Sequence, residues 1–264
     1  MIYIGTSGYS FNDWIKEVYP EGMSKSDMLK YYASVWRFNA VELNFTYYAL
    51  PTYKTIVSML RKTPSDFVFS VKLPASVTHE AWKSSTFPEE DVAKTLRALT
   101  PMLEEGRLKM LLAQFPYSFK DTPSNRQYLR LLRDRIDAPV AIEFRHASWN
   151  NESAYELLKT FGFTFVIVDE PNLRDLFPYV PKVTSAVAYF RFHGRNRDWF
   201  NAPEGERYNY KYSDEEILVF AGDVSRISRQ VVDTFVFFNN CYRGNAVRDA
   251  MRLRQMIERA LLGS

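Results

Sequence analysis

Polar side chains that could do chemistry stand at the carboxyl ends of short apolar runs along this chain. The series consists of Glu42, Asn44, Lys72, Gln114, Glu143, Arg145, Asp169, Arg191, His193, Asn239 and Asn240. If the runs are strands, residues two apart share a face, so Glu143 points with Arg145 and Arg191 with His193. Charges inside strands are costly unless they are paired. We expect this ring to line a ligand site; the alternative is an interior layer of ion pairs that fixes strand register.

Four members of the ring are candidate catalytic residues: Glu42, Glu143, Asp169 and His193. Two carboxyl groups in different environments can divide the roles of acid and base. A histidine changes its charge near neutral pH and can take either role. We predict that Glu143, Asp169 and His193 move protons.

Basic residues late in the chain favour an anionic ligand. Arg195 and Arg197 follow Arg191, and Arg243 precedes a helical segment. Barrel proteins often bind phosphate in the loops after strands seven and eight, and arginine offers a bidentate fork for it. The candidate ligand-binding residues are Asn44, Lys72, His79, Gln114, Arg145, Arg191, Arg195, Trp199, Asn239 and Arg243. The alternative is that Arg145 and Arg191 only neutralise the acids.

Metal and cofactor chemistry has weaker signals. His193 ends a predicted strand and His79 and His146 lie in regions that follow strands, and with the acids the three histidines could bind a divalent metal. They lack a tight spacing such as H-x-x-x-H, so we predict no metal site. The chain has no phosphate loop, dinucleotide turn or nucleophile elbow, and no cofactor is evident. Cys241 is expected to pack as a small buried side chain.

The elements that must position these residues alternate along the whole chain. Strands are predicted at residues 2–6, 40–44, 67–72, 109–114, 139–145, 164–169, 187–193 and 234–240, and helices at 26–37, 52–61, 89–105, 124–135, 152–161, 214–232 and 245–262. The connection 170–185 contains three prolines, Pro171, Pro178 and Pro181, and is expected to hold only a short or irregular helix. Eight such units in 264 residues predict one domain, a single (β/α)8 TIM barrel over residues 1–264, with a doubly wound open sheet as the competitor.

Aromatic residues are concentrated in the connections that follow strands. The chain has 20 Phe, 17 Tyr and 5 Trp. Some of them should anchor loops, and others should offer flat faces to a base or a sugar ring. The loop 194–212 interleaves Arg195, Arg197 and Arg207 with Trp199, Phe200 and Tyr208, a pattern that suits a lid over a nucleotide-like ligand.

Composition excludes several classes of protein. The formal charge is +3, and a single cysteine excludes an internal disulfide and a four-cysteine zinc site. The first residues do not resemble a signal peptide, and no apolar stretch approaches a membrane span. We therefore expect a cytoplasmic protein without membrane contact; the sequence does not predict its oligomeric state.

Seven ordered segments resemble the successive blocks of the YecE-like family, catalogued as domain of unknown function 72. They are GTSGYSFNDW, VELNFTYY, VKLPASVTH, QFPYSF, AIEFRHASW, YFRFHGR and FFNNCYRG. The resemblance covers nearly the whole chain and implies a TIM barrel. It supplies no activity, although the family is sometimes set beside xylose isomerase-like barrels, including endonuclease IV.

The function predicted from these residues is an enzyme that performs acid–base chemistry on an anionic, phosphate-bearing substrate, as a hydrolase, lyase or isomerase. The alternative is a nucleic-acid-binding protein, with metal-assisted nuclease activity if it resembles endonuclease IV. Salt dependence separates the two, because binding to a nucleic-acid backbone releases counterions and weakens steeply with salt.

Overall fold

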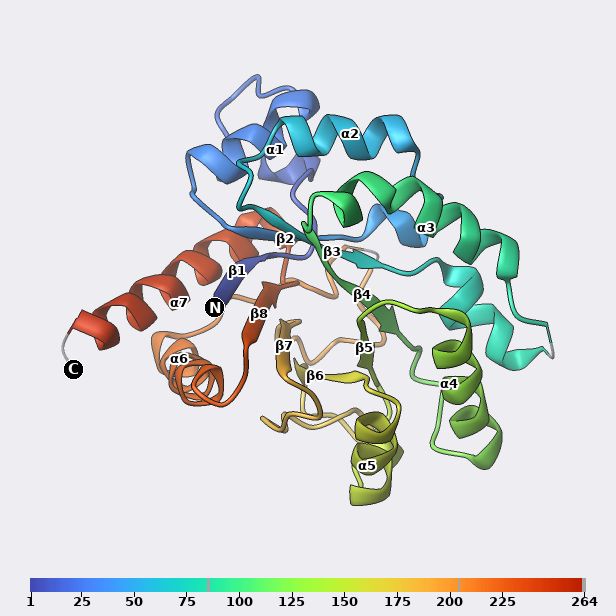
Figure 1. Ribbon diagram of the computed structural model, residues 1–264. Helices are drawn as coiled ribbons and strands as arrows, with labels where there is room; N and C mark the ends of the chain where they lie inside the picture. Colours follow the sequence, from blue (N-terminus) through green and yellow to red (C-terminus); the bar gives the residue numbers. More distant parts are fainter. Residues whose placement is uncertain (85, 204, 263–264) are drawn as a thin grey trace.

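Eight parallel strands form the centre of the molecule in the computed structural model, which describes residues 1–84, 86–203 and 205–262 (Figure 1). The strands are β1 (Ile2–Thr6), β2 (Ala40–Leu43), β3 (Val68–Lys72), β4 (Leu108–Gln114), β5 (Val140–Glu143), β6 (Thr164–Asp169), β7 (Val187–Phe192) and β8 (Asp233–Phe238). Their hydrogen-bonded order runs β1-β8-β7-β6-β5-β4-β3-β2, so the strands from β2 to β8 pair in sequence order, β8 pairs with β1, and β1 and β2 are the two ends of the order. The predicted TIM barrel is confirmed.

Helices surround the strands in Figure 1. Within the described ranges they are α1 (Lys25–Ser34), α2 (Tyr53–Arg61), α3 (Glu89–Glu104), α4 (Pro123–Arg135), α5 (Glu152–Thr160), α6 (Asp214–Ser228) and α7 (Asn245–Leu262). The segment 170–186, all of which is described, contains no helix, in line with its prolines. No helix in the described part of the chain is long and apolar enough to span a membrane.

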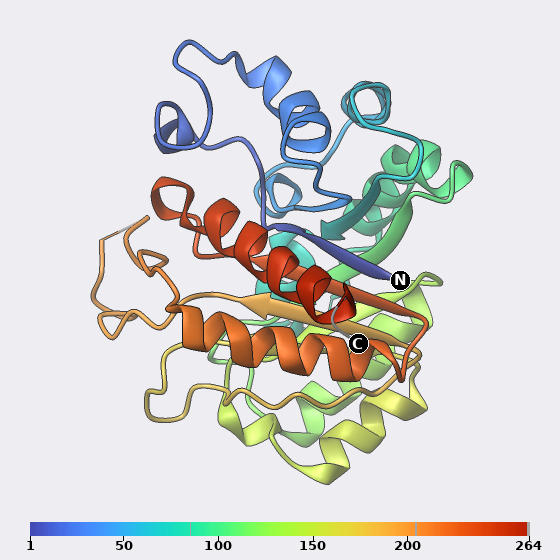
Figure 2. The same ribbon diagram turned by 90° about the vertical axis from the view of Figure 1, so that its left-hand side faces the viewer.

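Short helical turns follow the strands. They are η1 (Asn12–Trp14), η2 (Phe45–Tyr47), η3 (Ser76–Glu80), η4 (Ala81–Lys83), η5 (Ala147–Trp149) and η6 (Tyr242–Gly244). Figure 2 shows the orange loop between β7 and α6 at the end of the barrel opposite the two termini. The strands therefore deliver their carboxyl ends to a face built from long, structured connections.

Helix starts follow from capping chemistry. Ser213 accepts a hydrogen bond from the backbone of Glu216, whose side chain accepts one from the Ser213 backbone, so the sequence Ser-Asp-Glu-Glu begins α6 with a capping box. Thr122 and Asn151 cap α4 and α5 in the simpler way, by accepting from the backbone three residues on.

Buried aromatic residues anchor the connections to the barrel. Trp14 donates from its indole nitrogen to the Cys241 carbonyl, and Trp149 donates to the Phe119 carbonyl at 2.7 Å. Trp149 also stacks on Phe144 with 4.2 Å between ring centroids. Part of the aromatic excess therefore serves packing. Cys241 is itself buried, and burial raises the pKa of its thiol, as expected for a packing residue.

The seam between β1 and β2 is closed largely by side chains. One backbone hydrogen bond joins the two strands near their carboxyl ends, from the Gly8 amide to the Glu42 carbonyl at 2.8 Å. Near the amino ends of the strands, Asn39 accepts from the Ile4 amide at 2.8 Å and donates to the Ile2 carbonyl at 3.0 Å. The Tyr32 hydroxyl accepts from the Thr6 amide at 2.8 Å and donates to the Ala40 carbonyl at 3.1 Å. These two side chains substitute for a strand ladder.

Gly5 is required at this seam, and Gly5→Ala should be strongly destabilising. An added Cβ would stand 2.1 Å from the Ala40 carbonyl oxygen and 2.7 Å from the Tyr32 hydroxyl, so β1 and β2 would have to separate. We expect a loss of about 3 kcal/mol in the free energy of unfolding, at the upper end for overpacking. Urea denaturation of the variant measures this loss.

Gly222→Ala is the matched control, because Gly222 lies inside α6 with no atom within 4 Å of the added methyl group. That change should raise stability by up to about 1 kcal/mol through helix propensity. Equal stability of the two variants would contradict the tight β1–β2 approach.

Candidate active site at the carboxyl end of the barrel

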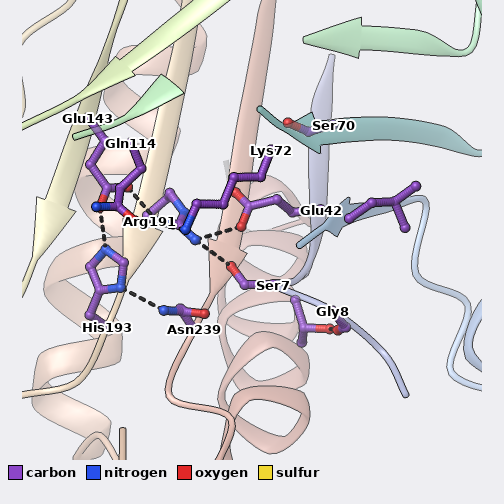
Figure 3. Close-up of polar contacts among 12 residues, drawn as sticks. Ser7, Gly8, Glu42, Ser70, Lys72, Gln114, Glu143, Arg191, His193 and Asn239 are labelled. Carbon is purple, nitrogen blue, oxygen red and sulfur yellow. Dashed lines mark hydrogen bonds and ion pairs between the residues drawn. The ribbon is translucent and has the colours of Figure 1, made fainter. Parts of the chain in front are cut away.

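A buried arginine joins two glutamates from opposite parts of the barrel. Arg191 on β7 donates from Nη2 to Glu42 Oε1 on β2 at 2.6 Å and from Nη1 to Glu143 Oε2 on β5 at 2.5 Å (Figure 3). Arg191 is 2% exposed and both acids are fully buried. These ion pairs correspond to the alternative given for the strand-end charges, an interior layer of ion pairs, and they cross the barrel interior.

Two uncharged residues that the sequence did not single out complete this layer. Tyr189, two residues before Arg191 on β7, donates to Glu42 Oε2 at 2.7 Å. Ser70 on β3 lies 2.7 Å from the Tyr189 hydroxyl. Burial, and then Glu42, hold the pKa of Tyr189 well above its ordinary value, so its hydroxyl remains a donor. Alternation along β3 and β7 was the signal that could have found both.

Arg145 extends the network toward the cavity above. Its Nε lies 2.7 Å from Glu143 Oε1, and its Nη1 donates to Glu170 Oε2 at 2.6 Å. Burial alone would raise the pKa of Glu143, but Arg191 and Arg145 hold it well below its ordinary value. For Glu170 burial prevails over Arg145 and raises the pKa to about 7. The network thus combines a permanently ionised glutamate with one that titrates near neutrality.

His193 is fixed between Glu143 and Asn239. Its Nε2 lies 3.2 Å from Glu143 Oε1, and its Nδ1 lies 2.9 Å from the Asn239 side-chain nitrogen (Figure 3). An amide nitrogen only donates, so Nδ1 accepts and Nε2 carries the proton. Burial, and then Arg145, lower the pKa of His193 to about 3. At neutral pH the ring is therefore uncharged; Nδ1 contacts Asn239, whereas Nε2 lies near Glu143 without making a hydrogen bond.

A cavity of about 300 Å³ opens above this network. The last residues of β3 and β4 and side chains from the connections after β2, β3, β4, β5, β6 and β7 surround it: Tyr47, Tyr48, Lys72, His79, Gln114, Pro116, Tyr117, Arg145, Leu176, Trp199, Phe200, Arg207 and Tyr208. Three of these residues are cations and none is an acid. Burial, and then Lys72, lower the pKa of His79 to about 4, so the lining is positive at neutral pH.

Lys72 is the most unusual of the cations. Its Nζ donates to Gln114 Oε1 at 2.8 Å and lies 4.3 Å from the centre of the Tyr47 ring. Gln114 is oriented for this contact because its amide nitrogen donates to the Phe115 carbonyl. Within the described residues no carboxylate lies within 4.0 Å of Nζ. Burial, and then Arg191, lower the pKa of Lys72 to about 7.

The loop after β7 covers one side of the cavity. Trp199 is 4% exposed, and the guanidinium groups of Arg145 and Arg207 lie 5.5 and 5.6 Å from its ring centre. Phe200 contacts Tyr117 of the β4 connection, with 5.6 Å between ring centroids. The loop borders the cavity, and its action as a lid stays a prediction. The contacts already made by Trp199 leave the more exposed Phe200 as the residue that is open to stacking.

Other predicted site residues lie elsewhere. Asp169 was expected beside the other acids, but it points to the outer side of β6, where Arg195 contacts it at 2.7 Å and the Tyr212 hydroxyl donates to it at 2.7 Å. Glu170 occupies the inward position instead. Asp169 and Arg195 border a separate cavity of about 350 Å³.

Arg243 and Asn44 also stand apart from the cavity lining. Arg243 is exposed beyond β8, with positive φ and its backbone amide bonded to Asp13. Asn44 follows β2 directly, and its buried Oδ1 has no hydrogen-bond partner in the described part of the chain. Glu42, Glu143, Arg191, His193 and Asn239 lie beneath the cavity, whereas Lys72, His79, Gln114, Arg145 and Trp199 line it.

The donor set for a metal is also absent from the described ranges. No three His, Cys, Asp or Glu side chains there are grouped so that they could hold a metal ion. His79 and His193 belong to separate parts of the site, and His146 accepts from the Ser148 backbone. We derive no step through a metal.

Comparisons with known proteins agree with the resemblance noted in the sequence. The family model described as "Protein of unknown function DUF72" matches residues 3–263. UPF0759 protein YunF of Bacillus subtilis is 30% identical over 275 residues, which cover 98% of this chain and 95% of YunF. UPF0759 protein YecE of Escherichia coli strain K12 is 29% identical over 148 residues, covering 55% of this chain and 49% of YecE. The crystal structure of a DUF72 family protein from Thermotoga maritima matches with a TM-score of 0.93 and 53% identity, covering 98% of this chain and 99% of that one.

Proposed function

The chain belongs to the DUF72 family of proteins of unknown function, and we propose that it is an enzyme that performs acid–base chemistry on a small, phosphate-bearing anion. One observation carries the proposal: the cavity at the carboxyl end of the barrel is lined by Lys72, Arg145 and Arg207 and by no acid. Strand-end side chains at this face of a TIM barrel are those that act on substrates.

Size and lining favour a compact substrate with a flat or ring-shaped part. A cavity of about 300 Å³ is at the small end of the range for ligand pockets. Tyr47, Tyr117, Phe200 and Tyr208 supply aromatic faces around it. Guanidinium groups bind phosphate through paired hydrogen bonds, so Arg145 and Arg207 are the expected anion ligands.

Proton transfer is assigned to Lys72 rather than to Glu143 or His193. A general acid or base works best when its pKa is near the working pH, and the pKa of Lys72 is about 7. Glu143 stays ionised in contact with two arginines, and burial lowers the pKa of His193 to about 3, far from neutrality. Glu42, Glu143 and His193 therefore act as positioning residues, which hold Arg145 and Arg191 in place. Removal of a proton from the substrate is a step that isomerases and lyases share.

Arg207→Ala should weaken anion binding without affecting stability. Arg207 is exposed and lies over Trp199, so an anion on its guanidinium should change the Trp199 fluorescence. We expect the affinity for glucose 6-phosphate, used as a probe, to fall about tenfold, since a charge-assisted hydrogen bond contributes about 1.5–3 kcal/mol. Fluorescence titration measures this change, and Trp199→Phe assigns the signal.

Lys211→Ala is the matched control, because Lys211 is an exposed cation on the same loop that does not line the cavity. Equal affinities for the two variants would contradict the proposal.

The nucleic-acid alternative is tested with a short single-stranded oligonucleotide. Binding of the oligonucleotide alone, with a steep decline as salt is added, would favour that function instead.

A further inference from the structure

We propose that Lys72 is a nucleophile that forms an imine with the substrate, so that the substrates are small aldehydes or ketones bearing a phosphate or carboxylate group. The inference rests on the proposed function, because the same cavity must hold the anionic group. It adds a covalent step and a defined class of substrate.

The surroundings of Nζ leave it free to attack. Lys72 donates to Gln114 and rests on the Tyr47 ring, and no carboxylate in the described ranges pairs with it. Lys94 and Lys182, by contrast, pair with acids: Lys94 lies 2.7 Å from Glu90, and Lys182 lies 2.6 Å from Glu152. A carboxylate partner favours the protonated amine, which has no lone pair, whereas contacts with an amide oxygen and a ring are compatible with the neutral one.

The charges around Lys72 come from several strands. Arg191 on β7 and Arg145 after β5 disfavour its protonation, whereas Glu143 on β5 and Glu42 on β2 favour it. Both acids are already bound to Arg191, which reduces their effect on the amine. His79, also facing the cavity, is neutral at pH 7. Burial is the largest influence and sets the direction, so a large share of Lys72 is neutral where a surface lysine is almost fully protonated.

Anchors for the rest of the substrate line the same cavity. Arg145 and Arg207 offer forks for a phosphate or carboxylate group, and the cavity volume of about 300 Å³ keeps a bound carbonyl group near Nζ. Holding both reactants in one small cavity replaces a bimolecular encounter with an intramolecular attack.

Imine formation on Lys72 proceeds in two stages, addition of the amine to the carbonyl group and loss of water. The Nζ lone pair attacks the carbonyl carbon, the carbon–oxygen π electrons move to oxygen, and a proton passes from nitrogen to that oxygen. The resulting carbinolamine loses its hydroxyl group, which leaves with a second proton from nitrogen as water, and a carbon–nitrogen double bond forms. Amine and carbonyl compound thus become imine and water.

Reductive trapping tests the inference. The protein is incubated at pH 7 with glyoxylate, or with pyridoxal 5′-phosphate as a phosphate-bearing aldehyde, together with sodium cyanoborohydride, which reduces imines to stable amines. Peptide mass spectrometry locates the adducts. We expect Lys72 to be labelled at least about tenfold faster than exposed Lys54, because its amine is neutral at a much lower pH. The labelling rate of Lys72 should level off just above pH 7.

Two controls separate this inference from the proposed function. Lys72→Arg keeps the positive charge but should form no adduct at this position, and inorganic phosphate should slow the labelling of Lys72 but not of Lys54. Labelling of Lys72 no faster than Lys54 overturns the inference; if glucose 6-phosphate still binds, the proposed function stands. Fast labelling of Lys72 that phosphate does not slow supports the nucleophile and overturns the role of the anion site.

Discussion

Arg191→Ala should lower the free energy of unfolding by about 3–5 kcal/mol, the range for breaking a buried ion pair from one side. Arg191 is 2% exposed and contacts Glu42 at 2.6 Å and Glu143 at 2.5 Å. Without it, Glu42 loses its only cationic contact in the described residues, and Glu143 keeps only Arg145 and neutral His193. Urea denaturation at neutral pH measures the loss.

Lys109→Ala provides the comparison. Lys109 lies at the amino end of β4, away from the candidate site at the carboxyl ends, and it has no ion pair in the described residues. It should change stability by less than about 0.5 kcal/mol. Adding Glu42→Gln to Arg191→Ala should recover part of the loss, since a neutral amide costs less to bury than an unpaired carboxylate. An Arg191→Ala protein that keeps wild-type stability and loses only ligand binding would show that Arg191 is a ligand-binding residue instead.

The pairing inside the barrel was predictable where alternation along a strand is visible in the sequence. Residues two apart share a face, so Glu143 and Arg145, and Arg191 and His193, were expected together, and the structure places each pair inside. The cost of burying a charge then required partners of opposite sign. At these positions the alternation of side chains along the strand and the need to pair buried charges predict the same inward orientation.

The sequence was less informative for β6. All the residues before Asp169 on this strand are buried, so no polar alternation marks which side faces inward. Asp169 and Glu170 are adjacent, and only one of them can face the barrel interior. Contacts with residues far away in sequence determine which of the two faces inward. Glu170 contacts Arg145 inside the barrel, whereas Asp169 contacts Tyr212 and Arg195 on the outer side.

The β1–β2 seam and the position of Arg243 depend on contacts that no local pattern encodes. Asn39 and Tyr32 close the seam because their amide and hydroxyl groups happen to reach backbone groups far away in sequence. Arg243 follows β8, where TIM barrels often bind phosphate. Its backbone amide nevertheless donates to Asp13, and its side chain lies over the Tyr242 ring, outside the cavity.

Lys72→Met should make the protein more stable at neutral pH, by about 1–3 kcal/mol, while abolishing imine formation. Burial holds the pKa of Lys72 at about 7, against 10.5 for an ordinary lysine, so the folded protein binds this proton less tightly than the unfolded chain. Methionine fills similar space without a charge. Water in the cavity can take over the hydrogen bond to Gln114.

The pH dependence identifies the cause of the gain. Below pH 7 Lys72 is protonated in both states, and the full cost of burying its charge is present. Between pH 7 and 10.5 the unfolded chain binds more protons, so the wild-type protein becomes more stable relative to the variant as pH rises. Urea denaturation of both proteins from pH 6 to 10 should show the difference shrinking, whereas Lys54→Met, at an exposed position, should show no such trend. A variant that is less stable than wild type throughout would mean that the Lys72 charge is stabilised in the fold. The neutral amine needed for attack on a carbonyl group would then be missing.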